Sequence, residues 1–107
     1  MKIIEISKMH RGWMIGDFLP SVLKTDVFEV GYLTHKKGEK WAKHYHKVAT
    51  EYNLLIRGSM KVCDQKINPG QIFIIEPNEV ADPIFYEDCE ILCIKTPSLP
   101  KDKYEVL

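Results

Sequence analysis

The sequence predicts an all-β protein that folds as an antiparallel sandwich or barrel. Short apolar runs are separated by turn residues about every 8–12 positions, the spacing expected of strands in such folds. No segment carries a convincing 3.6-residue apolar period, so long helices are not expected. With 107 residues the chain has room for one hydrophobic core, and we expect a single domain.

The expected strands occupy residues 27–96, which we predict to form the barrel. In order along the chain they are 27–33, a short extended piece beginning at 44–46, 51–57, 60–63, 71–75, 83–86 and 90–95. Turn residues close these runs, and the clearest turn is the Asn-Pro-Gly sequence at 68–70. We expect residues 1–26 to cover the barrel and residues 97–107, which include two prolines, to run along its surface.

Charge and composition exclude several classes of protein. Fifteen basic and fifteen acidic residues cancel, so we do not expect nonspecific nucleic-acid binding. No apolar run approaches the roughly 18–20 residues that span a bilayer, and we expect no membrane insertion. Charged residues interrupt the amino-terminal apolar run, which therefore does not resemble a signal peptide. The three cysteines form no CxxC pair, which favours a cytoplasmic location, where thiols stay reduced.

Two histidines and a glutamate are spaced to meet on one face of the sheet. His44 and His46 are two residues apart, so on a strand both imidazoles point to the same side. Glu51 opens the next expected strand, and its carboxylate reaches the imidazoles if the two strands are neighbours. Such a set binds a divalent transition metal (Fe, Mn, Ni, Cu or Zn) and leaves positions open for water or substrate. The alternative is two surface histidines near a glutamate, with no specific metal site.

These residues lie inside a longer pattern. Between Gly38 and Gly58 the sequence reads Gly, five residues, His-x-His, four residues, Glu, six residues, Gly. This segment resembles the first conserved motif of the cupin superfamily at every fixed position. The resemblance implies a small antiparallel jelly-roll barrel, the cupin fold, with a pocket open at one mouth. It also implies that His44, His46 and Glu51 are metal ligands and that the two glycines occupy turns.

The second cupin motif is matched only in part. From Gly70 the turn and the following strand fit, and Asn78 stands where the motif has a turn glycine, because Asn tolerates positive φ. The histidine that usually completes the metal site is replaced by Ala81. Asp82 is the nearest substitute ligand, and a one-residue bulge would turn it toward the site. His35 is a second candidate; otherwise Asp82 only bends a turn, and water completes a three-ligand site.

Alternation along residues 51–57 predicts the two faces of that strand. If Glu51 faces the pocket, Asn53 and Leu55 face it as well, and Asn53 is placed either to contact a ligand or to satisfy buried backbone groups. The apolar residues between them then face outward and need cover, from the amino-terminal segment or from a second subunit. We expect a homodimer, the common form of small cupins.

The loop around the histidines contains an aromatic residue and several lysines that are candidates for lining the pocket. Trp41 is a candidate for its wall, although most aromatic residues belong to a core or an interface. A group of lysines flanks the histidines and either attracts an anion to the mouth or forms a solvated loop: Lys36, Lys37, Lys40, Lys43 and Lys47.

The resemblance implies a small-molecule substrate or ligand and leaves three functions open. The first is a metal-dependent enzyme, of the oxygenase, isomerase, decarboxylase or lyase class. The second is a non-catalytic module that binds or senses a small acid, sugar or sugar nucleotide. The third is a metal-independent sugar-nucleotide isomerase or epimerase, for whose acid–base pair His35, Tyr86 and Tyr32 are available. Because the fold hosts many chemistries, the sequence does not choose among them.

Overall fold

The computed structural model describes residues 1–106, and its regular secondary structure is almost entirely β, as predicted. Within this range the only helix is one 3-10 turn, η1 (Ile6–Lys8), and no helix is long and apolar enough to cross a membrane. The strands are β1 (Trp13–Gly16), β2 (Leu23–Lys24), β3 (Glu29–His35), β4 (His44–Tyr45), β5 (Thr50–Arg57), β6 (Met60–Val62), β7 (Gln65–Ile67), β8 (Ile72–Ile75), β9 (Ile84–Phe85), β10 (Cys89–Thr96) and β11 (Tyr104–Glu105).

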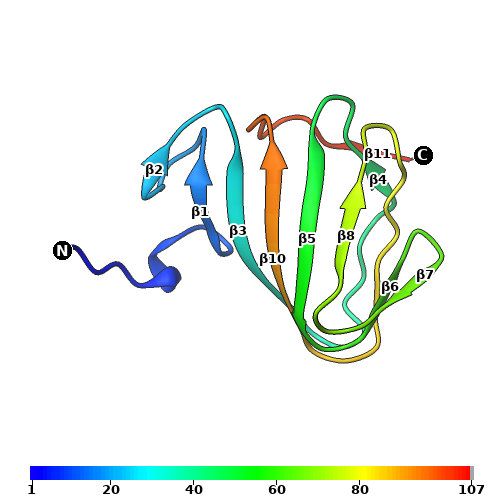
Figure 1. The fold of residues 1–107 in the computed structure, drawn as a ribbon. Helices are drawn as coiled ribbons and strands as arrows, with labels where there is room; N and C mark the ends of the chain where they lie inside the picture. Colours follow the sequence, from blue (N-terminus) through cyan, green and yellow to red (C-terminus); the bar gives the residue numbers. More distant parts are fainter. Residues whose placement is uncertain (107) are drawn as a thin grey trace.

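The strands form two layers. Strands β2-β1-β3-β10-β5-β8 make one six-stranded sheet, which Figure 1 shows across the front of the molecule. Its neighbours are antiparallel except for β1 and β2. The opposing layer consists of a three-stranded sheet, β7-β6-β9, and a two-stranded sheet, β11-β4.

The jelly-roll fold is confirmed, and among residues 1–106 its sheets are not hydrogen-bonded into a closed barrel. Strands of the second layer contain only two or three residues each and are separated by turns. Within residues 1–106 no continuous hydrogen-bonded ladder therefore joins them to both edges of the larger sheet. The space between the layers stays accessible instead of being sealed by paired strands.

Strand β5 shows how the two faces of the larger sheet differ. Glu51, Asn53 and Leu55 are buried, whereas Tyr52 and Ile56 point outward and are 42% and 45% exposed. The inward face contributes to the apolar core between the layers, which contains Leu55, Met60, Val62, Ile67, Ile75, Ala81, Phe85, Cys89 and Ile91. Burying a large apolar side chain stabilises a fold by roughly 1.5–3 kcal/mol, so this cluster holds the layers together.

Turn residues of both motifs have the backbone that the sequence predicts. Gly38 and Gly58 adopt positive φ angles of 76° and 105°. A Cβ atom at Gly58 would stand only 2.5 Å from the Asp88 carbonyl oxygen. Asn78 has a φ of 71° and so takes the conformation for which the second motif uses glycine.

Both ends of the chain join the layers. Strands β1 and β2 extend the six-stranded sheet, and Trp13 packs on Gly31, where a Cβ atom would stand 2.7 Å from the indole ring. At the other end the chain returns to the second layer, where β11 pairs with β4 (Figure 1). The carboxyl-terminal tail therefore runs beside the segment that carries the two histidines.

Candidate metal centre

His44 and His46 lie on a short extended segment that is held along both edges. On one side β4 pairs with β11, with Glu105 opposite His44. On the other side the His44 N–H donates to the Ala81 carbonyl at 3.1 Å, and the Ala81 N–H donates back at 2.7 Å. The Asn78 N–H donates to the His46 carbonyl at 2.7 Å. The backbone that carries both imidazoles is therefore fixed.

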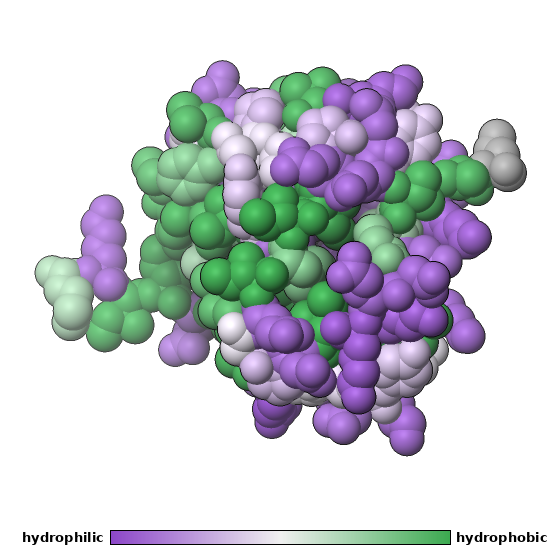
Figure 2. Space-filling model, turned by 45° about the vertical axis from the view of Figure 1, so that its right-hand side comes forward, coloured by the Kyte–Doolittle hydropathy of each residue, from purple (hydrophilic) through white to green (hydrophobic). Residues whose placement is uncertain are grey.

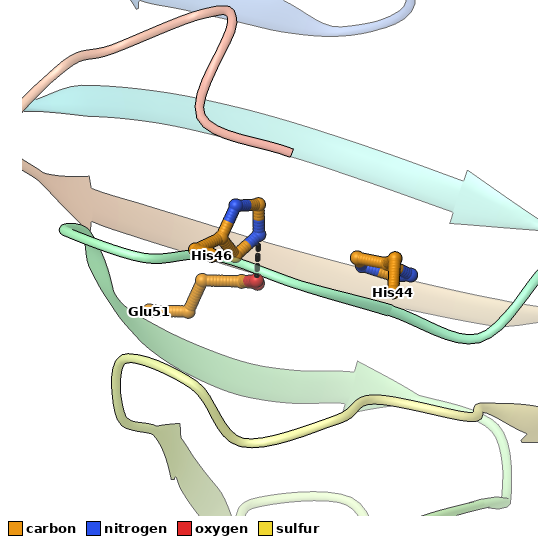
Figure 3. Close-up of side chains that lie close together, drawn as sticks. All are labelled: His44, His46 and Glu51. Atoms are coloured by element: carbon orange, nitrogen blue, oxygen red, sulfur yellow. Dashed lines mark hydrogen bonds and ion pairs between the residues drawn. The ribbon is translucent and has the colours of Figure 1, made fainter. Parts of the chain in front are cut away.

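The three predicted ligand side chains meet between the layers (Figure 3). One ligand atom each from His44, His46 and Glu51 lies within 4.8 Å of the other two. His46 Nε2 is 2.8 Å from Glu51 Oε2, and the centroids of the two imidazole rings are 5.7 Å apart. His46 and Glu51 are buried, and His44 is partly exposed. The structure thus brings together the residues that the sequence pattern selects.

A backbone carbonyl sets the orientation of each imidazole. His44 Nδ1 donates to the Ala42 carbonyl at 3.1 Å, and His46 Nδ1 donates to the Asp102 carbonyl. A neutral imidazole that donates from Nδ1 has its lone pair at Nε2, where a metal binds. Outer hydrogen bonds of this kind orient the histidine ligands of metal sites. His44 therefore keeps Nε2 free for coordination, whereas His46 Nε2 faces Glu51 Oε2 at 2.8 Å.

Asp102, from the tail, holds the turn between His46 and β5. Its carboxylate accepts hydrogen bonds from the N–H groups of Lys47 at 2.9 Å, Val48 at 3.1 Å and Ala49 at 2.9 Å. Burial opposes ionisation of this carboxyl group, but the three donors outweigh burial and lower the pKa of Asp102. One residue thus shapes the turn with its side chain and orients the imidazole with its carbonyl.

The electrostatic environment favours the metal-binding forms of the ligands. Burial by itself raises the pKa of a carboxyl group, but the hydrogen bond from His46 and the positive charge of Lys95 lower the pKa of Glu51 to about 2. Burial lowers the pKa of His44. The ionised carboxylate and the neutral imidazole are the species that coordinate transition metals.

The structure does not bring Asp82 into this group. Ala81 is buried and lines the large cavity between the two layers, called the main cavity below. Asp82 lines a separate small pocket, and its carboxylate is 3.8 Å from Lys43 Nζ. Although Ala81 and Asp82 are consecutive, they thus line different pockets. His35 does line the main cavity, but its Nδ1 is engaged with Glu39 Oε2 at 2.6 Å.

The ligand side chains line a cavity of about 1220 Å³ between the two layers. Aromatic residues, among them Trp41 and Phe85, form part of its wall. Of the five lysines that flank the histidines, only Lys40 lines this cavity. Three other cations that the sequence pattern does not single out also line it: Arg11, Lys95 and Lys103.

The donor set fits a single divalent transition metal. Two imidazole nitrogens and one carboxylate oxygen suit Fe, Mn, Ni, Cu or Zn, and such ligands bind zinc at roughly 2.0–2.2 Å. His46 Nε2 and Glu51 Oε2 already face each other, and an ion bound there would replace the proton that they share. Three protein ligands would leave coordination positions for water or substrate, as in catalytic rather than structural sites.

Comparison with known proteins identifies the fold but gives no close relative. No protein-family model matches the sequence, and no curated protein is significantly similar to it. Among solved structures, an uncharacterized conserved protein from Klebsiella pneumoniae with a double-stranded β-helix domain is 18% identical. The two superpose with a TM-score of 0.73, over 98% of this chain and 91% of the other.

Two further structures of similar fold are named for reactions. The DMSP lyase DddQ from Ruegeria pomeroyi is 12% identical, with a TM-score of 0.69 over 88% of this chain and 49% of the lyase. The Streptomyces nucleoside dehydratase Pac13 is 10% identical, with a TM-score of 0.65 over 77% of this chain and 70% of the dehydratase. At these identities the likeness concerns the fold alone. The chain therefore has the double-stranded β-helix fold of the cupin type.

Proposed function

We propose that the chain binds one divalent transition metal through His44, His46 and Glu51 and acts on a small metabolite in the adjoining cavity. The observation that carries this proposal is the convergence of three ligand side chains, two of them buried, at the wall of that cavity. A bound metal supplies Lewis-acid character. The chain's own residues hold the ligands in place, since Asp102 and Ala42 orient the two imidazoles.

Among the reaction classes that suit such a site, we favour a lyase. Two proteins of similar fold are named a lyase and a dehydratase, and both names describe eliminations. An elimination needs a base that removes a proton from the substrate. His35 lines the cavity, and because its Nδ1 is engaged with Glu39, its Nε2 is the nitrogen available to accept that proton.

The proposal is tested on protein purified without a histidine tag. We expect about one equivalent of a transition metal per chain, which is the stoichiometry of a single three-ligand site. Metal-stripped protein and protein reloaded with Fe(II), Mn(II), Ni(II) or Zn(II) are then screened against pooled metabolites by NMR. Consumption of a metabolite should require the metal and should disappear in His35→Gln, while the exposed-loop variant Lys37→Gln should keep it. Turnover by the metal-free protein would contradict the proposal.

A non-catalytic binding module is the alternative, and one observation favours it. Ala81 occupies the place beside His44 from which a fourth ligand would come. This alternative predicts that a metabolite raises the melting temperature of the metal-loaded protein without being consumed. A metal-independent isomerase has less support, because Tyr86 does not line the cavity and the Tyr32 hydroxyl donates to Glu90.

We also propose a homodimer formed through the outer face of the six-stranded sheet. Tyr52, Ile72 and Ile74 are 42%, 68% and 50% exposed, and Tyr52 is paired in register with Ile74 on one side and Ile94 on the other. Figure 2 shows hydrophobic residues gathered across the left and centre of the view, where part of this face lies. A two-fold partner would cover the same patch on both copies.

Sedimentation velocity tests the dimer. The unsubstituted chain should sediment at twice the mass of one copy, and Ile74→Lys should give a monomer because it puts a charge into the patch. Lys37→Gln, outside the patch, should stay dimeric. A monomer for the unsubstituted chain would refute this assembly.

A cytoplasmic location is likewise a proposal, supported by thiol chemistry. All three cysteines are free, and Cys63 is exposed. Alkylation of protein in freshly lysed cells should label Cys63 as a thiol. Recovery of Cys63 as a mixed disulfide instead would argue for an oxidising compartment.

A further inference from the structure

Two cations at the rim of the cavity have no carboxylate partner among residues 1–106. Arg11 Cζ lies 5.4 Å and Lys103 Nζ 4.6 Å from the centroid of the Trp41 ring, and both residues line the cavity. Neither forms an ion pair with a described residue, Glu105 on the same tail included. Two like charges at one ring repel each other, so a bound anion would stabilise this arrangement.

Two of the carboxylates that line the cavity are already engaged. Glu29 Oε1 is 3.7 Å from Lys95 Nζ, and Glu29 Oε2 accepts a hydrogen bond from Ser98 at 2.8 Å. Glu39 Oε2 accepts a hydrogen bond from the Trp41 indole N–H at 2.6 Å. Glu29 and Glu39 are therefore not free to pair with the two rim cations, while Glu105, which also lines the cavity, forms no ion pair with a described residue.

Further inside the cavity, Asn53 carries a donor without an acceptor. Its Nδ2 is the only buried side-chain nitrogen or oxygen in residues 1–106 that makes no hydrogen bond, and the residue is 4% exposed. Asn53 follows Glu51 by two positions on β5, faces inward with it and lines the cavity. Because an unpaired buried donor is costly, a ligand oxygen that accepts from Asn53 would be strongly favoured.

We propose that the cavity takes a small molecule with a carboxylate or phosphate group, which Lys103 and Arg11 bind beside Trp41, while Asn53 Nδ2 donates to a second oxygen of the molecule. The proposal rests on the proposed function, because it places this ligand next to the metal-binding residues.

The test uses the full chain, stripped of metal, so that anions cannot bind through an ion. At a mildly alkaline pH, where free imidazole is neutral and lysine charged, the protein is titrated separately with acetate and with inorganic phosphate. The readouts are the ¹⁵N-correlated signals of the Asn53 side-chain amide and the Trp41 indole. We expect saturable shifts in the millimolar range, and the anion that binds more tightly identifies the group as carboxylate or phosphate.

Substitution of the rim cations provides the control. Lys103→Gln and Arg11→Gln should each weaken anion binding by at least about ten-fold, the effect of losing one charge-assisted hydrogen bond, while Lys37→Gln should change it less than about two-fold. Both rim side chains are exposed, so these variants should fold. Absence of saturable binding, or binding unaffected by both substitutions, would overturn the proposal.

A parallel titration of the same samples with Zn²⁺ separates this proposal from the metal proposal. Zinc binding without anion binding would overturn the oxyanion site and leave the metal centre standing. Anion binding without zinc binding would support the oxyanion site and contradict the metal centre.

Discussion

The segments 44–51 and 78–82 lie against each other across the hydrogen bonds between His44 and Ala81, yet they contribute differently to the cavity. The first places the three candidate metal ligands at the wall. The second places the methyl group of Ala81 there and turns Asp82 into another pocket. The backbone of the second segment nevertheless has the conformation expected of the second motif, because Asn78 has the positive φ of a turn glycine.

This difference shows that backbone geometry and ligand set are specified by different residues. The turn at Asn78 and the pairing with His44 need only a compatible backbone, and they hold the histidine segment whichever side chain stands at position 81. The candidate ligands all come from one segment, and the second segment contributes no ligand atom beside His44.

Removing a ligand side chain from the first segment should have the largest effect on zinc affinity. His46→Ala takes away a buried ligand and leaves only His44 and Glu51, so we expect zinc affinity to fall by at least about 100-fold. Isothermal titration calorimetry measures the change. His10→Asn, which removes an exposed histidine outside the ligand group, serves as the matched control. Equal affinities for the two variants would show that the first segment does not hold the metal.

Acidification should destabilise the metal-free protein through the carboxylates that hold the first segment. The folded-state pKa of Glu51 is about 2, below its ordinary value of 4.5, and the pKa of Asp102 is also lowered. A depressed pKa contributes stability above the unfolded-state value and loses it as the pH falls toward the folded-state value. Urea unfolding should therefore show a decline between about pH 5 and pH 2, of a few kcal/mol at most.

The variant Glu51→Gln identifies the source of that decline, because its side chain cannot titrate. Its unfolding free energy should depend less on pH over the same interval. If the slopes of the variant and the unsubstituted protein coincide, the ion pair between Glu51 and His46 does not contribute to stability.

Removing the Asp102 carboxylate, which binds the turn after His46, should lower zinc affinity by an intermediate amount. Asp102→Ala removes the acceptor for three N–H groups of the turn after His46, and the turn that sets the distance to Glu51 loosens. We expect zinc affinity to fall about 10-fold, as for other outer-sphere partners of metal ligands. Glu105→Gln, on the same tail, should leave the affinity nearly unchanged. A fall in thermal stability without a fall in metal affinity would limit Asp102 to a structural role.

Adding a metal-ligand side chain to the second segment should change zinc affinity least, and should raise it rather than lower it. Ala81 is buried, lines the cavity and pairs with His44, so Ala81→His puts an imidazole beside the site. We expect zinc to bind about 10-fold more tightly, with part of the gain offset by crowding of the packed core. Asp82→Asn should change the affinity less than about two-fold, because Asp82 faces a different pocket. A larger loss in Asp82→Asn would restore Asp82 as a ligand.

The local parts of the site could be predicted from sequence because they depend on strand periodicity. His44 and His46 are separated by two positions and Glu51 opens the neighbouring strand, so alternation alone places them on one side. The same argument placed Asn53 inward. The backbone at Asn78 followed from a conformational preference of a single residue.

The distant parts of the site could not be predicted, because they depend on the path of the chain ends. Asp102 meets His46 only because β11 returns to β4, and nothing in the composition of the tail indicates that pairing. Lys103 and Arg11 reach the cavity from opposite ends of the chain, while the lysine run near the histidines mostly does not line it. Cys63, read as part of an apolar strand, lies exposed in a turn with a φ of 47°.

The central claim is that His44, His46 and Glu51 together hold one metal ion. Anomalous diffraction at the absorption edge of the bound metal, from crystals of metal-loaded protein, tests it most directly. The account predicts a single peak at roughly 2.0–2.2 Å from one nitrogen of each imidazole and from the Glu51 carboxylate, with none at Asp82. A peak elsewhere, or no peak in protein that carries a full equivalent of metal in solution, would contradict it.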